Sequence, residues 1–232
     1  RRLGLVVKEI LPEASLVKPG DIIGHFYGHS KAIVIGEDYL IGCIGKPSGI
    51  ATAAYQFSQA VGNRPKIVSG GWKKMPFEIK ESIRNAVLTG GAHIRITNEP
   101  FLYLDKNYIE VFGGIRKCLE AASHLKNHLK AVQLKGKYGD IDDEAIEAVT
   151  LGADILFIDT GKLDDINKVA ARIKGIGRRD NVEIAFGGDI RIEDIEKLKS
   201  TDVDILDIGR AIIDAPLLDL KYEVKGIFND GS

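Results

Sequence analysis

The sequence predicts an α/β protein: a six-stranded parallel α/β barrel with a small N-terminal, sheet-forming (sandwich-like) appendage. From Lys66 onward, short β-branched runs alternate with segments of helical period, which is typical of βα units. The chain has 232 residues, enough for one such core but short for two domains of average size. The first 46 residues contain strand-like runs without helical periods between them. A doubly wound open sheet is the alternative arrangement of the same elements.

The predicted strands of the main sheet are short runs rich in Val, Ile and Leu. They cover residues 66–68, 93–96, 130–134, 154–158, 182–185 and 203–208. Apolar residues three and four positions apart, such as Ile83, Ala86 and Val87, predict helices between the strands. Because helical crossovers join consecutive strands, we expect the strands to run parallel.

The appendage is predicted from three further runs, at residues 5–7, 32–35 and 39–41, which are separated by turn residues such as Pro19 and Gly20. The expected organisation is a partial sandwich-like domain over residues 1–46, the barrel over 47–225 and a tail over 226–232.

Charge and composition restrict the class of protein. Lys and Arg together number 32 against 33 Asp and Glu, so the basic excess typical of nucleic-acid binders is missing. No apolar run approaches the roughly 20 residues of a membrane-spanning helix, and we expect a cytoplasmic protein without membrane association. Cys43 and Cys118 lie far apart without CxxC spacing, which favours free thiols over a disulfide or zinc site.

Two consecutive units predict a phosphate site. Each has a strand that ends in glycine and then enters a helix, so that backbone N–H groups can approach an anion. In barrels the loops after the last two strands commonly bind phosphate. The residues expected to bind it are Gly187, Gly188, Asp189, Gly209 and Arg210. The alternative is that these glycines are ordinary turn residues.

Five sequence patterns occur in a fixed order along the chain. They are SGIAT at 48–52, TGGAHIR at 89–95, NYIEVFGG at 107–114, ADILFID at 153–159, and FGGDI at 186–190 followed by APLLDL at 215–220. In this order they resemble the quinolinate phosphoribosyltransferase family, also called carboxylating nicotinate-nucleotide pyrophosphorylase. The resemblance implies a six-stranded barrel joined to an amino-terminal sandwich, in a homodimer or higher homo-oligomer in which one sandwich covers the partner's barrel mouth.

The same resemblance implies a reaction. Phosphoribose would move from 5-phosphoribosyl 1-pyrophosphate, with Mg²⁺, to quinolinate or a nicotinate-type ring, giving nicotinate mononucleotide or a related nucleotide. The implied catalytic residues are Arg95, His93, Lys73, Lys74, Lys106 and Asp159, and Asp159 is also the implied metal ligand. The expected partner is therefore a small phosphorylated metabolite.

Several positions depart from the family pattern. Asp38 stands where the family has an arginine that reaches the neighbouring active site, and Asp105 stands where it has a lysine. The carboxylate of the family's EVE segment falls near Leu134 and Lys135, and Phe186 replaces a serine. The phosphate end is thus retained while the ring-binding side differs.

Two other functions remain open from the sequence. One is a different sugar-phosphate barrel enzyme, a lyase or isomerase, for which Lys135 is the only strand-end lysine that could form a Schiff base. The other is a homologue that binds a phosphoribosyl ligand without turnover, which the replaced cationic residues suggest.

Overall fold

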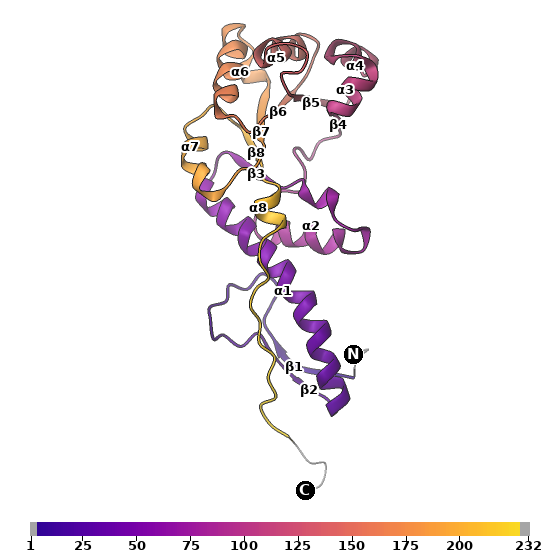
Figure 1. Ribbon diagram of the computed structural model, residues 1–232, viewed down its shortest axis with the longest axis vertical. Coiled ribbons are helices and arrows are strands. Elements are labelled where there is room, and N and C mark those ends of the chain that lie inside the picture. Colours follow the sequence, from indigo (N-terminus) through magenta and orange to yellow (C-terminus); the bar gives the residue numbers. More distant parts are fainter. Residues whose placement is uncertain (1–3, 228–232) are drawn as a thin grey trace.

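A computed structural model describes residues 4–227, and its centre is a six-stranded sheet (Figure 1). The strands are β3 (Lys66–Val68), β4 (Phe101–Leu104), β5 (Leu129–Leu134), β6 (Ile155–Asp159), β7 (Glu183–Gly187) and β8 (Ile205–Asp207). They lie in the order β3-β8-β7-β6-β5-β4, and every neighbouring pair is parallel. The predicted α/β class is confirmed.

The two faces of this sheet have different surroundings. On one face Val68, Ala131, Phe157, Ala185 and their neighbours pack only against other residues of the sheet and of the segment that precedes β4, with no helix residue in the cluster as far as the structure describes it. On the other face the strands pack against helices in one large core. Helices on a single face, together with pairing of the first strand to the last, favour a curved, barrel-like sheet over the doubly wound alternative.

The gap between β3 and β4 is where one strand prediction was wrong. Residues 93–96 form only an isolated bridge, His93 to Val68, and the strand before α3 is β4, which the sequence analysis missed. The carbonyls of Ile94 and Ile96 accept hydrogen bonds from the Trp72 indole and the Lys66 ammonium, at 3.1 and 2.9 Å. Side chains thus replace the ladder partners that a strand needs here.

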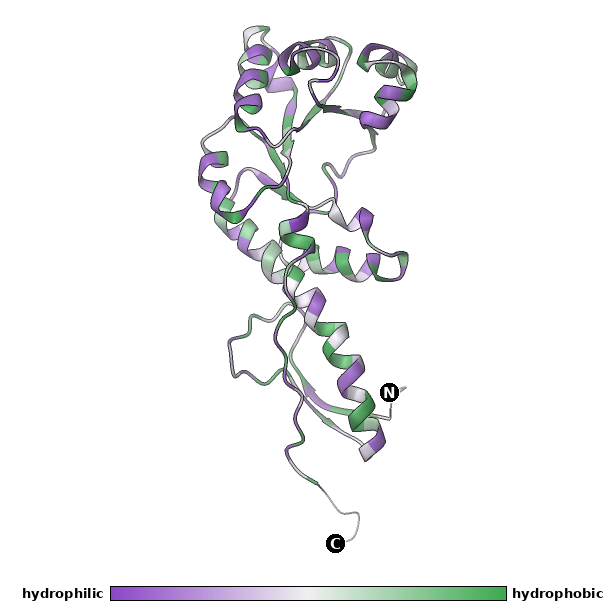
Figure 2. Cartoon of the chain, viewed as in Figure 1, coloured by the Kyte–Doolittle hydropathy of each residue, from purple (hydrophilic) through white to green (hydrophobic). Residues whose placement is uncertain are grey.

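Seven helices follow the strands in the body of the protein, within the part that the structure describes. They are α2 (Lys80–Thr89), α3 (Lys106–Phe112), α4 (Ile115–Ala121), α5 (Ile141–Thr150), α6 (Leu163–Gly175), α7 (Ile195–Lys199) and α8 (Arg210–Ile213). Short 3-10 turns cover Gly71–Lys74, Phe77–Ile79, Arg179–Asn181 and Ile192–Asp194. α5 and α6 carry acidic residues in their first turns, and α6 has basic residues in its last, as the helix dipole favours. Figure 2 shows the central strands as mainly hydrophobic and the surrounding helices as mixed.

The amino-terminal part contains an antiparallel pair, β1 (Val6–Ile10) and β2 (Gly24–Tyr27), followed by the 32-residue helix α1 (Ser30–Val61). The predicted strands at 32–35 and 39–41 were therefore wrong, since both lie within α1. From Ile50 onward α1 buries residues three or four positions apart against the body, and it runs through the expected domain boundary at 46/47.

The carboxyl-terminal segment returns alongside α1 (Figure 1). The Leu218 N–H donates to the Gly45 carbonyl at 2.9 Å, and a Cβ on Gly49 would lie 1.9 Å from the Pro216 carbonyl oxygen. Glycine at position 49 is thus required by this close approach. Within residues 4–227 no helix has the length and apolarity to span a membrane, and Cys43 and Cys118 are free thiols.

Candidate active site

Two carboxylates meet at the carboxyl ends of the strands. Asp159 ends β6 and Asp207 ends β8, and both alternate with inner-face residues, so they point toward the inside of the curved sheet. Burial raises the pKa of Asp207, and the charge of Asp159 raises it further. A hydrogen bond from the Gly70 N–H (2.8 Å) and the charges of Lys73 and Lys74 act in the opposite direction.

The loop after β3 places two predicted lysines at this mouth. The Lys73 ammonium lies 5.2 Å from the centre of the Tyr103 ring, and Tyr103 stacks edge-on against Phe157 of β6. Burial, and then the charges of Asp159, Asp207 and Asp105, raise the pKa of Tyr103, which keeps the phenol protonated. Lys73, Lys74 and Asp159 therefore lie near one another, and their catalytic roles stay a prediction.

A chain of hydrogen bonds holds Asp159. The Gln133 side-chain amide donates to Asp159 Oδ2 at 2.6 Å, and Lys135 Nζ lies 2.7 Å from the same oxygen. Gln133 Oε1 in turn accepts from the Lys106 backbone N–H at 2.7 Å. Lys106, another predicted catalytic residue, thus reaches the site through its backbone.

The loop that carries Lys135 is organised by one buried carboxylate. Glu144 of α5 is 4% exposed and accepts four backbone N–H groups. Its Oε2 accepts from Lys135 and Gly136 at 3.1 and 2.9 Å, and its Oε1 accepts from Lys137 and Tyr138 at 2.7 and 2.8 Å. A cavity of about 270 Å³ lies between this loop and α3, and Lys106, Gln133 and Lys135 are among its lining residues.

The predicted phosphate-binding glycines also have a packing role. Gly188 has φ +119°, and a Cβ there would lie 2.6 Å from the Gly161 amide nitrogen. A Cβ on Gly187 would lie 2.9 Å from the Phe157 ring. These glycines therefore let the loops after β6 and β7 touch. This agrees with the alternative in which the glycines serve the local fold. Phosphate binding by them stays a prediction.

The other predicted phosphate ligands lie at the same edge of the sheet. Arg210 forms an ion pair with Asp189 at 2.5 Å, and this hydrogen bond with Arg210 lowers the pKa of Asp189. Gly209 precedes Arg210, and no atom lies within 4 Å of the position a Cβ would take there. A phosphate bound by Arg210 would compete with the Asp189 carboxylate for the guanidinium.

Two predicted catalytic residues do not reach the carboxylates. The Arg95 guanidinium lies 5.3 Å from the ring centre of Phe101, the first residue of β4. Burial, and next the charge of Lys66, lower the pKa of His93. Within the described residues, no hydrogen bond or ion pair joins either side chain to Asp159 or Asp207.

Sequence reasoning missed Gln133, Tyr103 and Asp207 as parts of this site. The signal was the period of two along each strand, which places Gln133 and Asp207 on the same face as Asp159. The same period corrects the position expected for the counterpart of the family's EVE carboxylate, near Leu134 and Lys135. Leu134 is fully buried on the helix-covered face, and Gln133 is the residue of β5 on the face of Asp159.

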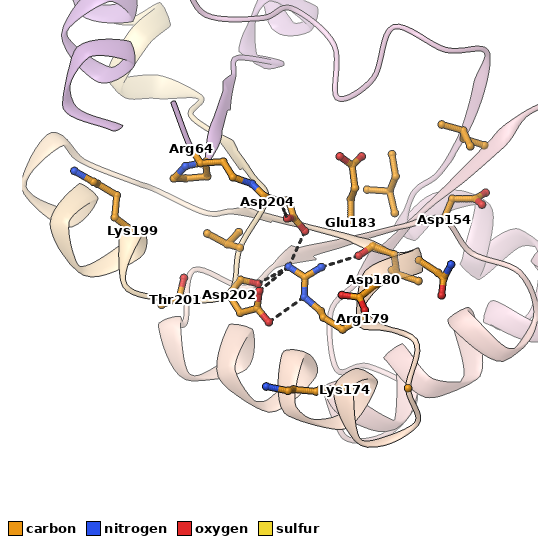
Figure 3. Close-up of a pocket in the computed structure, with 17 residues that line it drawn as sticks. Arg64, Asp154, Lys174, Arg179, Asp180, Glu183, Lys199, Thr201, Asp202 and Asp204 are labelled. Carbon is orange, nitrogen blue, oxygen red and sulfur yellow. Dashed lines mark hydrogen bonds and ion pairs between the residues drawn. The ribbon is translucent and has the colours of Figure 1, made fainter. Parts of the chain in front are cut away.

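Another pocket lies at the opposite end of the sheet, near the starts of β6, β7 and β8 (Figure 3). Arg179 contacts Asp202 and Asp204 there, each at 2.8 Å, and Arg64 also pairs with Asp204. Asp204 is buried and accepts the Ile184 N–H as well. These ion pairs link the segments at residues 64, 179 and 202–204. In barrels the reacting groups lie at the carboxyl ends of the strands, so the candidate site is the mouth that holds Asp159.

Comparisons with known proteins point to one family. The family model described as "Quinolinate phosphoribosyl transferase, C-terminal domain" matches residues 50–223. The chain is 28% identical to a probable nicotinate-nucleotide pyrophosphorylase (carboxylating) of Archaeoglobus fulgidus, over 95% of this chain and 84% of the relative. It is 25% identical to the nicotinate-nucleotide pyrophosphorylase (carboxylating) of Rattus norvegicus, over 96% of this chain and 74% of the relative.

Solved structures show the same fold. A nicotinate-nucleotide pyrophosphorylase from Pyrococcus furiosus superposes with a TM-score of 0.80 at 23% identity, covering 93% of this chain and 59% of that one. One from Ehrlichia chaffeensis superposes with a TM-score of 0.78 at 19% identity, covering 92% and 75%.

Proposed function

The chain belongs to the quinolinate phosphoribosyl transferase family, and from this premise we propose that it transfers phosphoribose from 5-phosphoribosyl 1-pyrophosphate to a pyridine carboxylate. With quinolinate, the ring nitrogen would bond to the anomeric carbon while pyrophosphate leaves with the bonding electrons. The carboxylate next to the nitrogen would leave as CO₂, and a proton would replace it on the ring, giving nicotinate mononucleotide.

One observation carries this proposal: Asp159 and Asp207 lie at the same mouth as Lys73 and Lys74. As the glycosidic bond breaks, positive charge develops on the ribose and negative charge on the pyrophosphate. Groups preorganised where charge develops stabilise the transition state. The carboxylates would face the ribose and the lysines the pyrophosphate.

Magnesium belongs to this proposal as part of the pyrophosphate substrate. No cluster of three or more His, Cys, Asp or Glu side chains suited to a metal occurs among residues 4–227. Asp159 Oδ2 already accepts two N–H donors, one of them cationic. These surroundings do not fit a resident cation, and the assignment of Asp159 as a metal ligand gains no support from them.

The proposed architecture is a barrel in which residues 93–97 span the gap between β3 and β4. We also propose a homo-oligomer in which the amino-terminal lobe, made of β1, β2 and the first half of α1, covers the carboxyl ends of the strands in a partner subunit. Exposed apolar side chains on that lobe support this, notably Val6, Leu16 and Val34, which are 63%, 77% and 67% exposed.

The purified chain can be tested with 5-phosphoribosyl 1-pyrophosphate, Mg²⁺ and either quinolinate or nicotinate, by measuring pyrophosphate and nucleotide. The double variant Lys73→Met/Lys74→Met should raise KM for the pyrophosphate substrate by roughly tenfold or more, because two cations leave its site. Lys168→Met, an exposed lysine on α6, is the control. Absence of any nucleotide product with both pyridines would contradict the proposal. Substrate binding without turnover would instead support the non-catalytic alternative.

A further inference from the structure

Gln133 is a buried amide with a fixed orientation. It is 7% exposed, its Nε2 donates to Asp159 Oδ2 at 2.6 Å, and its Oε1 accepts the Lys106 N–H at 2.7 Å. One end of the side chain must donate and the other must accept. A primary amide meets both demands, whereas an ionised carboxylate can only accept. Glutamate at this position would face Asp159 with like charge.

Lys135 completes the environment of the same oxygen. Its ammonium lies 2.7 Å from Asp159 Oδ2 and also donates to the Asp159 backbone carbonyl. The loop that presents Lys135 is fixed by the four hydrogen bonds to Glu144. A divalent cation at Oδ2 would therefore meet a positive charge at close range, and like charges repel.

We propose that Gln133 is the positioning residue for Asp159, and that Gln133 and Lys135 together occupy the place of a resident divalent cation. The chain alone then has little affinity for divalent cations and takes Mg²⁺ only as the complex with its pyrophosphate substrate. The statement that Mg²⁺ arrives with the pyrophosphate substrate rests on the proposed function. The statement that the chain alone has little affinity for divalent cations concerns the protein without substrate and is tested without turnover.

The first test is Mn²⁺ binding to the full chain without any pyrophosphate substrate, followed by electron paramagnetic resonance. The wild type should show no saturable site comparable to that of Gln133→Glu/Lys135→Met. That variant pairs two carboxylates and removes the cation, so its affinity for Mn²⁺ should be about tenfold higher or more. Gln59→Glu and Lys126→Met make the same chemical changes at exposed positions and should behave as the wild type.

Two results of the Mn²⁺ experiment would contradict the proposal. Wild-type binding as tight as that of the double variant would overturn the proposal, and so would a double variant without any gain. If the wild type shows no turnover with any pyridine, the proposed function fails, while the Mn²⁺ comparison still decides whether Gln133 and Lys135 exclude a resident cation.

The second test separates positioning from structure. Gln133→Met keeps the side-chain volume and removes both hydrogen bonds. We expect kcat to fall by roughly tenfold to a hundredfold while KM for the pyrophosphate substrate changes little, because Asp159 would be displaced from the reacting ribose. A loss of activity that only matches the loss of folded protein, measured by circular dichroism on the same samples, would reduce Gln133 to a structural role.

Discussion

Replacing the buried Glu144 by Gln is a conservative change in size, but we expect it to destabilise the protein. Each of its carboxylate oxygens accepts two backbone N–H groups of the loop at 135–138. The substitution Glu144→Gln would keep one oxygen and its two bonds, but would turn an NH₂ group toward the other two N–H donors. The variant side chain would therefore lose two bonds and set donors against donors.

The expected magnitude follows from the geometry. A hydrogen bond to a charged group contributes about 1.5 to 3 kcal/mol when buried, and less where water can replace the partner. The loop residues are exposed, so water compensates in part. We expect Glu144→Gln to lower the free energy of unfolding by about 2 to 3 kcal/mol, and Glu144→Ala by about 3 kcal/mol. For a chain of this size, 3 kcal/mol corresponds to a Tm lower by roughly 6 to 12 °C.

Urea unfolding followed by circular dichroism measures both variants. Glu147→Gln is the control, because Glu147 lies one turn along α5 and pairs with Arg116 at the surface, an interaction worth less than about 1 kcal/mol. A Glu144→Gln protein within about 0.5 kcal/mol of the wild type would refute the reasoning, since it would mean that the loop does not depend on both oxygens.

Three further predictions concern the rest of the fold. Asp204→Ala should lower the free energy of unfolding by about 3 kcal/mol, because it removes the buried carboxylate that pairs with Arg179. Asp202→Ala, at an exposed carboxylate, should lower it by less than about 1 kcal/mol. Chemical denaturation of both variants checks this, and equal losses would contradict it. Gly188→Ala should destabilise the protein by about 2 kcal/mol or more, because the added Cβ overlaps its neighbours and the residue has a positive φ. Gly175→Ala, with open space around the added Cβ, should be neutral or stabilising. Thermal unfolding that shows the reverse order would disprove the packing role of Gly188. The pKa of Asp207 is raised in the folded state, so the stability that its protonated form contributes is present at low pH and is lost as the pH rises through the folded-state pKa. Asp207→Asn should therefore have a higher free energy of unfolding than the wild type at pH 7, and the difference should shrink toward pH 4. A difference that is constant with pH would argue against this origin.

Strands with a neighbour on each side were predictable from sequence, whereas β4, which pairs only with β5, was missed and the run at 93–96 was wrongly predicted as a strand. The runs at 130–134 and 154–158 lie in the middle of the sheet, where β-branched and apolar residues are buried on both faces. The run at 93–96 contains two β-branched Ile residues but lies at the gap in the sheet. Whether it forms a strand depends on partners distant in sequence, which composition does not reveal.

The amino-terminal region was misread for a related reason. Glycines such as Gly36 and Gly45 predict turns in an isolated segment. In α1 both are buried, Gly36 beside Leu5 and Gly45 beside the carboxyl-terminal segment. Their small size serves packing between distant segments, and no local pattern distinguishes that use from a turn.

The candidate site was partly predictable for the same physical reasons. Asp159 and the lysines after β3 could be assigned because strand ends and their loops are visible in the sequence. The contact of Lys73 with Tyr103 depends on the curvature that brings β4 toward β3, which is a property of the whole sheet. Gln133 was hidden because a single amide within an apolar run has no motif.

The continuity of α1 has a practical consequence for dissecting this protein. At 1.5 Å per residue its 32 residues form a rod about 48 Å long, and its second half forms part of the core that supports the sheet. A fragment that begins at residue 47 would start in the middle of a helix and would lose Gly45, which packs against Leu217 and accepts the Leu218 N–H. The stretch that the family model matches, residues 50–223, is therefore not the stretch that can be cut out and expressed, and fragments of this protein are best designed from the ends of α1.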